Sequence, residues 1–202
     1  MKKIISALCI LTLLFCLSAC GKKNKTPEET VKNLFTALQK YDEKEILKCF
    51  SSGSDATGSI LPKEESAMKY GGIYKAMLSK LSCSIEKTDY SDDESAAAVT
   101  VKVTYYDGSD AMLAALIDTK MNLGSSKKEF NELLNECFPE KLTESESVIE
   151  KEMIIPCVKT DDDTWIIGGI SEETATQFSE FFLCGISEGI DRFNELSEIG
   201  DK

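Results

Sequence analysis

The sequence predicts an α+β fold, in which helices pack on a curved, mainly antiparallel sheet of about four strands. Apolar residues recur with helical spacing over 26–80 and 172–199, and they alternate with polar residues over much of 81–106 and 148–170. A further segment with helical spacing, at about 109–142, separates the two alternating stretches. Helical runs that flank runs of strands are typical of the α+β class.

Capping signals mark the beginning of the first two helices. In Thr26-Pro27-Glu28-Glu29, a capping threonine precedes a proline in the first turn and a glutamate at the capping-box position. Asp42 and Glu45 repeat the capping pattern at the start of a second helix. The apolar residues expected on the buried faces are Val31, Leu34, Phe35, Leu38, Ile46, Cys49 and Phe50.

A loop at 51–60 and a third helix follow. Leu61-Pro62 opens this helix, which is expected to reach about Lys80. Gly71-Gly72 lies inside it and indicates either a kink or close packing against a neighbour.

Two β-hairpins are expected, and the first carries the strongest strand signal. Its turn is Ser91-Asp92-Asp93-Glu94. The second pairs a strand over 148–159 with a strand around Trp165, across the turn Thr160-Asp161-Asp162-Asp163, and Pro156 indicates an edge or a bulge. The residues expected on the buried faces are Leu81, Cys83, Ile85, Ala97, Val99, Val101, Val103, Tyr105, Met153, Ile155 and Cys157.

The remaining helical segments are an insertion and a long C-terminal helix. The insertion carries two apolar groups, Met112, Ala115, Leu116 and Thr119, then Phe130, Leu133, Leu134, Cys137 and Phe138, ending at Pro139. One helix is expected over 172–199, with Phe178, Phe181, Phe182, Ile186, Ile190 and Phe193 on its buried side. Cys184 falls on the polar side of this helix, so its thiol is expected to be exposed.

The extreme N-terminus has the pattern of an export signal. Met1-Lys2-Lys3 is positive, and the apolar run 4–17 would form a helix of only about 21 Å, against the roughly 30 Å hydrocarbon core of a bilayer. Ser18-Ala19 leads directly into Cys20-Gly21, which resembles the lipobox of bacterial lipoproteins. An ordinary secretory signal with an incidental Cys20, or an uncleaved anchor helix, remain as alternatives.

The lipobox resemblance implies that Cys20 receives a diacylglyceryl group, with palmitate-type chains, and becomes the new N-terminus after cleavage. The expected organisation is a signal peptide at 1–19, the lipidated cysteine with a polar tether at 20–26, and a single domain at 27–202. Several acyl chains hold a protein far more firmly than one, since each buried CH₂ contributes about 0.8 kcal/mol. The expected location is therefore the extracytoplasmic face of the cell membrane.

The charge of this chain excludes one class of partner. Loss of Lys2 and Lys3 with the signal leaves 21 basic against 35 acidic residues, a net charge of −14. Such a surface is repelled by nucleic acid, so no nucleic-acid partner is expected. The tether lysines Lys22, Lys23 and Lys25 could lie on anionic lipid headgroups, or they could belong to a solvated linker.

The cysteines give no metal site and no obvious disulfide framework. The chain has no histidine and no C-x-x-C motif, so the usual zinc spacings are missing and neither a metal nor a cofactor is expected. The five cysteines of the expected domain are an odd number, and most fall at apolar positions, which favours buried free thiols. A disulfide between Cys83 and Cys157 stays open if their strands are neighbours. These five cysteines are Cys49, Cys83, Cys137, Cys157 and Cys184.

Two segments prompt a resemblance in fold. Residues 27–35, which open the first helix, and 161–167, which form the last turn and strand, resemble those of bacterial lipoproteins with a nuclear-transport-factor-2-like (cystatin-like) cone. The resemblance covers roughly 26–170 and implies a curved sheet that wraps a helix around a concave pocket. The insertion and the C-terminal helix depart from the minimal pattern and could cap this pocket. Enzymes on this cone commonly use an Asp/His pair, which a chain without histidine cannot supply.

No constellation of residues points to catalysis, and we expect no enzymatic activity. The aspartates of the turn at 160–163 could bind Ca²⁺, but aspartate is also a favoured turn residue, and the EF-hand spacing is missing. Tyr105, Tyr106 and Trp165 are the candidate ligand-binding residues, although aromatic residues at strand spacing more often belong to a core.

The expected function is that of a membrane-anchored, non-enzymatic binding module for a small molecule, a peptide or a glycan. The alternative is a protein-interaction or accessory subunit of a cell-envelope complex. An open pocket in the cone would favour the first function, whereas a filled cone with a large exposed apolar patch would favour the second.

Overall fold

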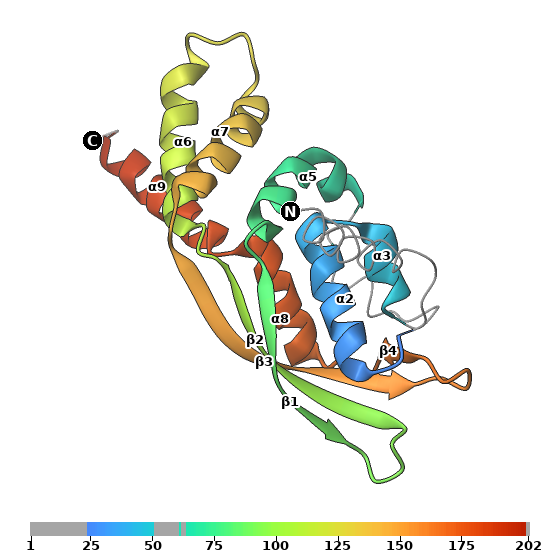
Figure 1. The fold of residues 1–202 in the computed structure, drawn as a ribbon. Helices are drawn as coiled ribbons and strands as arrows, with labels where there is room; N and C mark the ends of the chain where they lie inside the picture. Colours follow the sequence, from blue (N-terminus) through green and yellow to red (C-terminus); the bar gives the residue numbers. More distant parts are fainter. Residues whose placement is uncertain (1–23, 51–60, 62–63, 201–202) are drawn as a thin grey trace, which may run out of the picture.

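The protein is an α+β domain in which helices pack against one open, antiparallel sheet of four strands (Figure 1). The structure, a computed structural model, describes residues 24–50, 61 and 64–200. The predicted fold class is therefore confirmed. In chain order, the elements are α2 (Pro27–Lys40), α3 (Glu43–Lys48), α5 (Glu64–Leu78), β1 (Ser82–Tyr90), β2 (Ala96–Tyr106), α6 (Ser109–Leu123), α7 (Phe130–Glu144), β3 (Val148–Lys159), β4 (Trp165–Ile167), α8 (Glu172–Leu183) and α9 (Ile186–Gly200).

The sheet consists of the two predicted hairpins side by side, in the order β1-β2-β3-β4. The two long central strands pair along their whole length, from Ala96 opposite Val158 to Tyr106 opposite Val148. A register shift between Ile85 and Lys87 interrupts the pairing of β1 with β2. The alternation of apolar and polar residues thus fixes one face of the sheet toward the core.

Pro156 lies in β3, a central strand, opposite Ala98 of β2 and without a register shift, so neither the predicted edge strand nor a bulge is found there. Its carbonyl accepts a hydrogen bond from Gly168 N at 3.2 Å, beyond the short ladder that β3 forms with β4. In an antiparallel pair, the N–H and C=O of one residue point to the same neighbour. The side of Pro156 without a donor therefore faces away from β2, and no hydrogen bond of the central ladder is lost.

Helices α2 and α8 lie across the inner face of the sheet (Figure 1). The first helix begins where predicted, since the Thr26 side chain accepts a hydrogen bond from Glu29 N and a proline occupies the first turn. Thr30 fixes this helix to the sheet by donating to the carbonyl of Trp165 at 2.9 Å. The buried residues between helices and sheet are the predicted alternating set, among them Val99, Val101, Val103, Met153, Ile155 and Cys157.

The expected single C-terminal helix is wrong, because the chain forms two helices instead. Cys184 and Gly185 both have positive φ, 38° and 74°, which ends α8 and turns the chain into α9. Two further predictions fail at this break. Cys184 is only 1% exposed, with its Sγ 2.9 Å from the carbonyl oxygen of Phe181, whereas Ile190 is 40% exposed.

Helices α7 and α5 also differ from the prediction, α7 at its C-terminal end and α5 at its two glycines. Helix α7 does not end at Pro139 but continues through it to Glu144. Helix α5 continues through Gly71-Gly72, and a Cβ added to Gly72 would meet no atom within 4 Å, so close packing does not account for this glycine.

The five cysteines of the described residues are free. Cys83 lies opposite Val103 of β2, and Cys157 lies opposite Ala97 of the same strand. Because β2 separates the strands that carry these two cysteines, the condition for a Cys83–Cys157 disulfide is not met.

Candidate interaction surface on a helical arm

The three predicted ligand-binding side chains are buried in the core. The Tyr105 ring packs on Phe181 with 5.1 Å between ring centroids, and Trp165 packs edge-on against Tyr90 at 5.9 Å. Lys80 Nζ lies 4.7 Å from the centroid of the Tyr106 ring. All three side chains therefore contact atoms of their own chain, and their role in ligand binding stays a prediction.

Aromatic rings fill the space between α2, α8 and the sheet. Phe35 of α2 lies 6.0 Å from Phe181 and 6.4 Å from Phe178, measured between ring centroids. These rings join Tyr105 of β2 in one buried cluster. The part of the inner sheet face under α8 is thus occupied by side chains of the protein itself.

The hydroxyl group of Tyr105 links this cluster to charged side chains at the surface. The Tyr105 hydroxyl donates to Glu180 Oε2 at 3.3 Å, and the same carboxylate forms an ion pair with Lys151. Burial, together with the negative charge of Glu180, raises the pKa of Tyr105 well above its usual value. The phenol therefore remains protonated at physiological pH and acts as a hydrogen-bond donor.

Cys20, the predicted lipidation site, lies outside the described residues, and its modification stays a prediction. Within the part of the chain that the structure describes, no helix is long and apolar enough to cross a membrane. The same part contains no cluster of three or more acidic or cysteine side chains that could hold a metal ion.

A different surface is formed by α6, α7 and α9, which together project from one end of the sheet (Figure 1). We call these three helices the helical arm. The α6–α7 pair connects the end of β2 to the start of β3, and α9 packs along α6. The arm therefore stands beyond the last paired residues of the central strands, Tyr106 and Val148.

Small residues at the root fix the arm to the domain. Gly108 N donates to the carbonyl of Cys184 at 2.7 Å, which links the start of α6 to the break between α8 and α9. Asp107 accepts hydrogen bonds from both the backbone N and the hydroxyl of Ser109. At Gly189, an added Cβ would lie 2.4 Å from the Ser109 carbonyl oxygen. This spacing requires glycine, because no side chain fits where α9 crosses α6.

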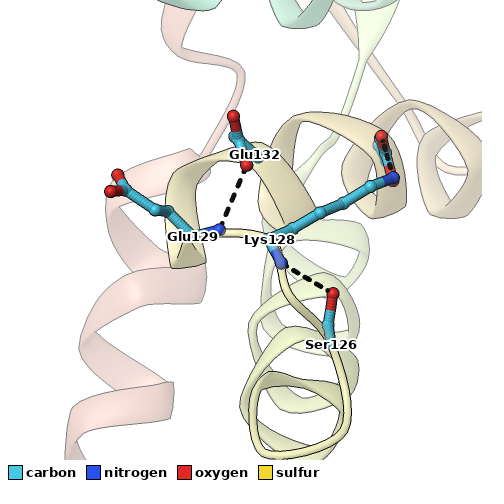
Figure 2. Close-up of polar contacts among 5 residues, drawn as sticks. Ser126, Lys128, Glu129 and Glu132 are labelled. Carbon is cyan, nitrogen blue, oxygen red and sulfur yellow. Dashed lines mark hydrogen bonds and ion pairs between the residues drawn. The ribbon is translucent and has the colours of Figure 1, made fainter.

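The tip of the arm is closed by its own polar contacts (Figure 2). Glu129 N donates to Glu132 Oε2 at 3.1 Å, which satisfies a backbone donor at the start of α7. Lys128 donates from its backbone N to Ser126 Oγ at 3.0 Å, and its Nζ pairs with Glu136 at 2.5 Å. The connection between α6 and α7 thus has a defined conformation.

Half of the large apolar side chains that are exposed among the described residues lie on the arm. Met121 is 77% exposed, Leu196 is 53% exposed and Ile117 is 37% exposed. Leu123 of α6, Ile190 of α9 and Leu183 at the end of α8 are exposed as well. Scattered exposed apolar residues are normal on a protein surface, but apolar residues gathered on one element indicate an interaction site.

An ion pair shows which of these residues lie together. Asp110 of α6 and Arg192 of α9 are joined at 2.6 Å. On α6, residues 110, 114, 117 and 121 follow the helical spacing that places them along one side, and on α9 Leu196 follows Arg192 by one turn. Ile117, Met121 and Leu196 therefore border the same side of the α6–α9 contact, and we call this surface the arm seam.

The charges along the arm seam are mainly acidic. The two basic residues of α6 and α9 are already engaged: Arg192 binds Asp110, and Lys120 Nζ lies 5.5 Å from the centroid of the Phe193 ring. The salt bridges of the described residues leave Asp191 and Glu195 without a basic partner. The acidic residues of these two helices whose side chains the structure describes are Asp110, Asp118, Glu188, Asp191 and Glu195.

The fold and this surface define an α+β domain with a projecting helical arm whose exposed seam is apolar and bordered by acids. Comparison of the chain with protein-family models, with curated proteins and with solved structures finds no match in any of the three. The resemblance to lipoproteins with a nuclear-transport-factor-2-like cone therefore stays a prediction.

The sequence pattern alone did not lead to a prediction of the arm seam, although it contains a signal for it. It assigned Met112, Ala115, Leu116 and Thr119 of α6 to a buried face, and all four are buried. The same helix carries apolar residues on its opposite side as well, at Ile117 and Met121. A helix that is apolar on all sides is normally surrounded by protein. This pattern could have indicated a surface for a partner.

Proposed function

We propose that this chain is a lipid-anchored envelope protein that acts without catalysis by binding another protein through its helical arm. The observation that carries the proposal is the exposure of Ile117, Met121 and Leu196 along one side of an ordered helical pair. The alternative, a module that takes a small molecule, a peptide or a glycan in the cone, depends on aromatic residues that are packed against their own chain. The arm therefore supports the protein-interaction function better.

The position of the arm suits a protein that is tethered at its N-terminus. The described chain begins at Asn24, whose carbonyl accepts a hydrogen bond from Trp165 N at 3.0 Å. The start of the described chain and the arm lie at opposite ends of β3. Trp165 pairs with Lys159, the last residue of this strand, whereas the arm begins next to Val148, the first residue of this strand. Twelve residues of strand separate the two ends by roughly 35–40 Å. An anchor at Cys20 would leave the arm directed away from the membrane surface.

The anchor is tested with Cys20→Ser in the full chain expressed in a bacterial host. Wild-type protein should incorporate radiolabelled palmitate and sediment with membranes, whereas the variant should do neither. An equal palmitate signal in the variant would contradict lipidation at Cys20.

The interaction is tested by photo-cross-linking on intact cells. A photoreactive amino acid at Met121 should give a discrete adduct with another envelope protein, identified by mass spectrometry of the cross-linked peptide. The matched control carries the same photoreactive residue at Ser84, which is exposed on β1 at a distance from the arm. The same adducts from both positions, or none from Met121, would contradict an interaction through the arm.

A further inference from the structure

We infer that the arm seam binds a basic amphipathic helix of the partner protein. This inference rests on the proposed function and adds the chemistry of the partner. It follows from the spacing of the exposed apolar residues and from the sign of the charge around them.

The exposed apolar residues follow the arm seam for a length that a partner helix could cover. Ala114, Ile117 and Met121 extend over two turns of α6, and Leu196 borders the same seam from α9. A partner helix that lies along the seam would present apolar residues at i, i+3 or i+4, and i+7. It would then complete a packed group of three helices, as helices in bundles do.

The charges favour a basic helix. Glu188 lies one turn before Arg192 and Glu195 lies almost one turn after it, so both are on the side of α9 that borders the seam. Asp118 lies one turn after Ala114 on α6 and is paired with Lys141 of α7 at 2.9 Å. Lysine or arginine residues that flank the apolar stripe of the partner would meet Glu188 and Glu195 at the edge of the interface.

The same charges disfavour a second copy of this chain as the occupant. In a symmetric pair, the same surface of each copy faces the other, so the acidic side of α9 that carries Glu188 and Glu195 would face the same acidic side of the second copy. Arg192 already pairs with Asp110 within the arm, and Lys120, which contacts Phe193 and Ser197, is the one other base of α6 and α9, so acidic residues remain in excess. Complementary charge at the edge of an interface mainly selects the partner and accelerates association, while apolar contacts provide the affinity.

The inference is tested with a fluorescein-labelled helical peptide made of leucine and lysine in an amphipathic pattern. The control peptide has the same leucine pattern, with glutamate in place of lysine. Binding to the full chain in a neutral detergent is followed by fluorescence anisotropy, with detergent alone as the blank. The lysine peptide should bind, binding should weaken as the salt concentration increases, and the glutamate peptide should not bind.

Variants of the protein then locate the site. Replacing Met121 and Leu196 by serine keeps the charge and should weaken binding of the lysine peptide by about tenfold or more. Ile154→Ser is the matched control, because Ile154 is similarly exposed but lies on the sheet. Glu188→Gln with Glu195→Gln should weaken binding and reduce its salt dependence, whereas Glu86→Gln on β1 should change neither.

The inference is overturned by equal binding of both peptides, by binding that the Met121 and Leu196 variants leave unchanged, or by absence of binding. Sedimentation experiments could also reveal a dimer. If the Met121 and Leu196 variants dissociate this dimer, a second copy occupies the seam, and the inference is overturned. The proposed function and the inference about the partner are tested by different outcomes. A cross-link from Met121 to a partner segment that is not basic would retain the proposed function and exclude the inference, whereas absence of both cross-link and peptide binding would exclude both.

Discussion

Thr119 is a buried residue of α6 whose hydroxyl group lacks a hydrogen-bond partner among the described residues. Its side chain is completely buried. A buried polar group without a partner lowers the free energy of unfolding by about 1–3 kcal/mol relative to a satisfied group. The Thr119 hydroxyl is therefore expected to lower the stability of the arm.

We expect Thr119→Val to raise the free energy of unfolding by about 1 kcal/mol, since valine has a similar shape and no hydroxyl. The measurement is equilibrium denaturation in urea. Thr119→Ser keeps the hydroxyl and removes a buried methyl group, so it should lower the stability by about 1 kcal/mol. A destabilised valine variant would show that the hydroxyl has a partner in solution.

Gly189 is the other residue whose identity follows from its surroundings. An added Cβ would lie 2.4 Å from a carbonyl oxygen of α6 and 2.8 Å from Met112 Cβ, so one of the helices would have to shift. Gly72 of α5 provides the contrast, because a Cβ there would meet nothing within 4 Å. The same substitution should thus have opposite effects at these two helical glycines.

Gly189→Ala should lower the free energy of unfolding by about 1–3 kcal/mol through overpacking. Gly72→Ala should raise it by about 0.5–1 kcal/mol, because alanine favours the helix more than glycine does. Both changes can be measured from thermal unfolding curves under the same conditions. If Gly189→Ala proves as stable as the wild type, α9 does not approach α6 as closely as described.

At the scale of an element, the β1–β2 hairpin depends on a charged turn. Asp93 Oδ1 accepts hydrogen bonds from Ser91 Oγ at 2.7 Å, from Ser95 Oγ at 2.8 Å and from Ser95 N at 3.1 Å. These hydrogen bonds lower the pKa of the Asp93 carboxyl group to about 2, from a usual value of 3.8. The ionised carboxylate therefore contributes to the stability of the turn.

This lowered pKa makes the contribution dependent on pH. Between pH 4 and pH 2 the unfolded chain binds a proton at this carboxyl group and the folded chain does not, so the stability from Asp93 is present above about pH 4 and is lost as the pH falls toward 2. Asp93→Asn, which resembles the protonated state, should lower the melting temperature at pH 7 and have little effect near pH 2. Asp92→Asn is the control, because the hydrogen bonds given above do not involve Asp92. A difference that persists unchanged at pH 2 would contradict this role of the carboxylate.

At the scale of the whole molecule, three buried thiols report on the integrity of the core. Cys49 follows α3, Cys157 lies in β3 and Cys184 ends α8, and burial raises the pKa of each thiol to about 12. Thiolate is the reactive form of cysteine, so these groups are protected at neutral pH by both burial and protonation. Their reactivity should depend on unfolding rather than on local chemistry.

We therefore expect alkylation by iodoacetamide at pH 8 to modify these three cysteines only at the rate of global unfolding. Cys83 is half-buried and should react sooner, which provides an internal comparison within the same sample. Mass spectrometry of the digested protein gives the extent of modification at each site. Fast labelling of Cys184 alone would show that the break between α8 and α9 opens locally, and a cysteine found in a disulfide would contradict the free thiols described above.

The sequence by itself determined the class of the fold, the two hairpins and the starts of the N-terminal helices. These features depend on interactions between near neighbours along the chain: the alternation in 96–106, and the caps at Thr26 and Asp42. It also contains the export and lipobox pattern at Cys20, which stays a prediction. Local patterns suffice for these features in any fold of this class. A capping side chain satisfies backbone N–H groups of its own helix, and the alternation along a strand places its apolar residues on one face.

Only the tertiary structure decided where the second half of the chain is divided and which apolar residues remain uncovered. The spacing of Phe178, Phe181, Ile186 and Ile190 is compatible with one continuous helix, but the chain turns at Cys184-Gly185, and Gly189 then lies close to Ser109 of α6. Phe178 and Phe181 of α8 are buried against Phe35 of α2 and Tyr105 of β2, whereas Ile190, Ile117 and Met121 remain exposed where α9 lies along α6. Apolar periodicity identifies the residues that favour burial, whereas the contacts between distant elements decide which of them are buried within the chain and which remain available to a partner.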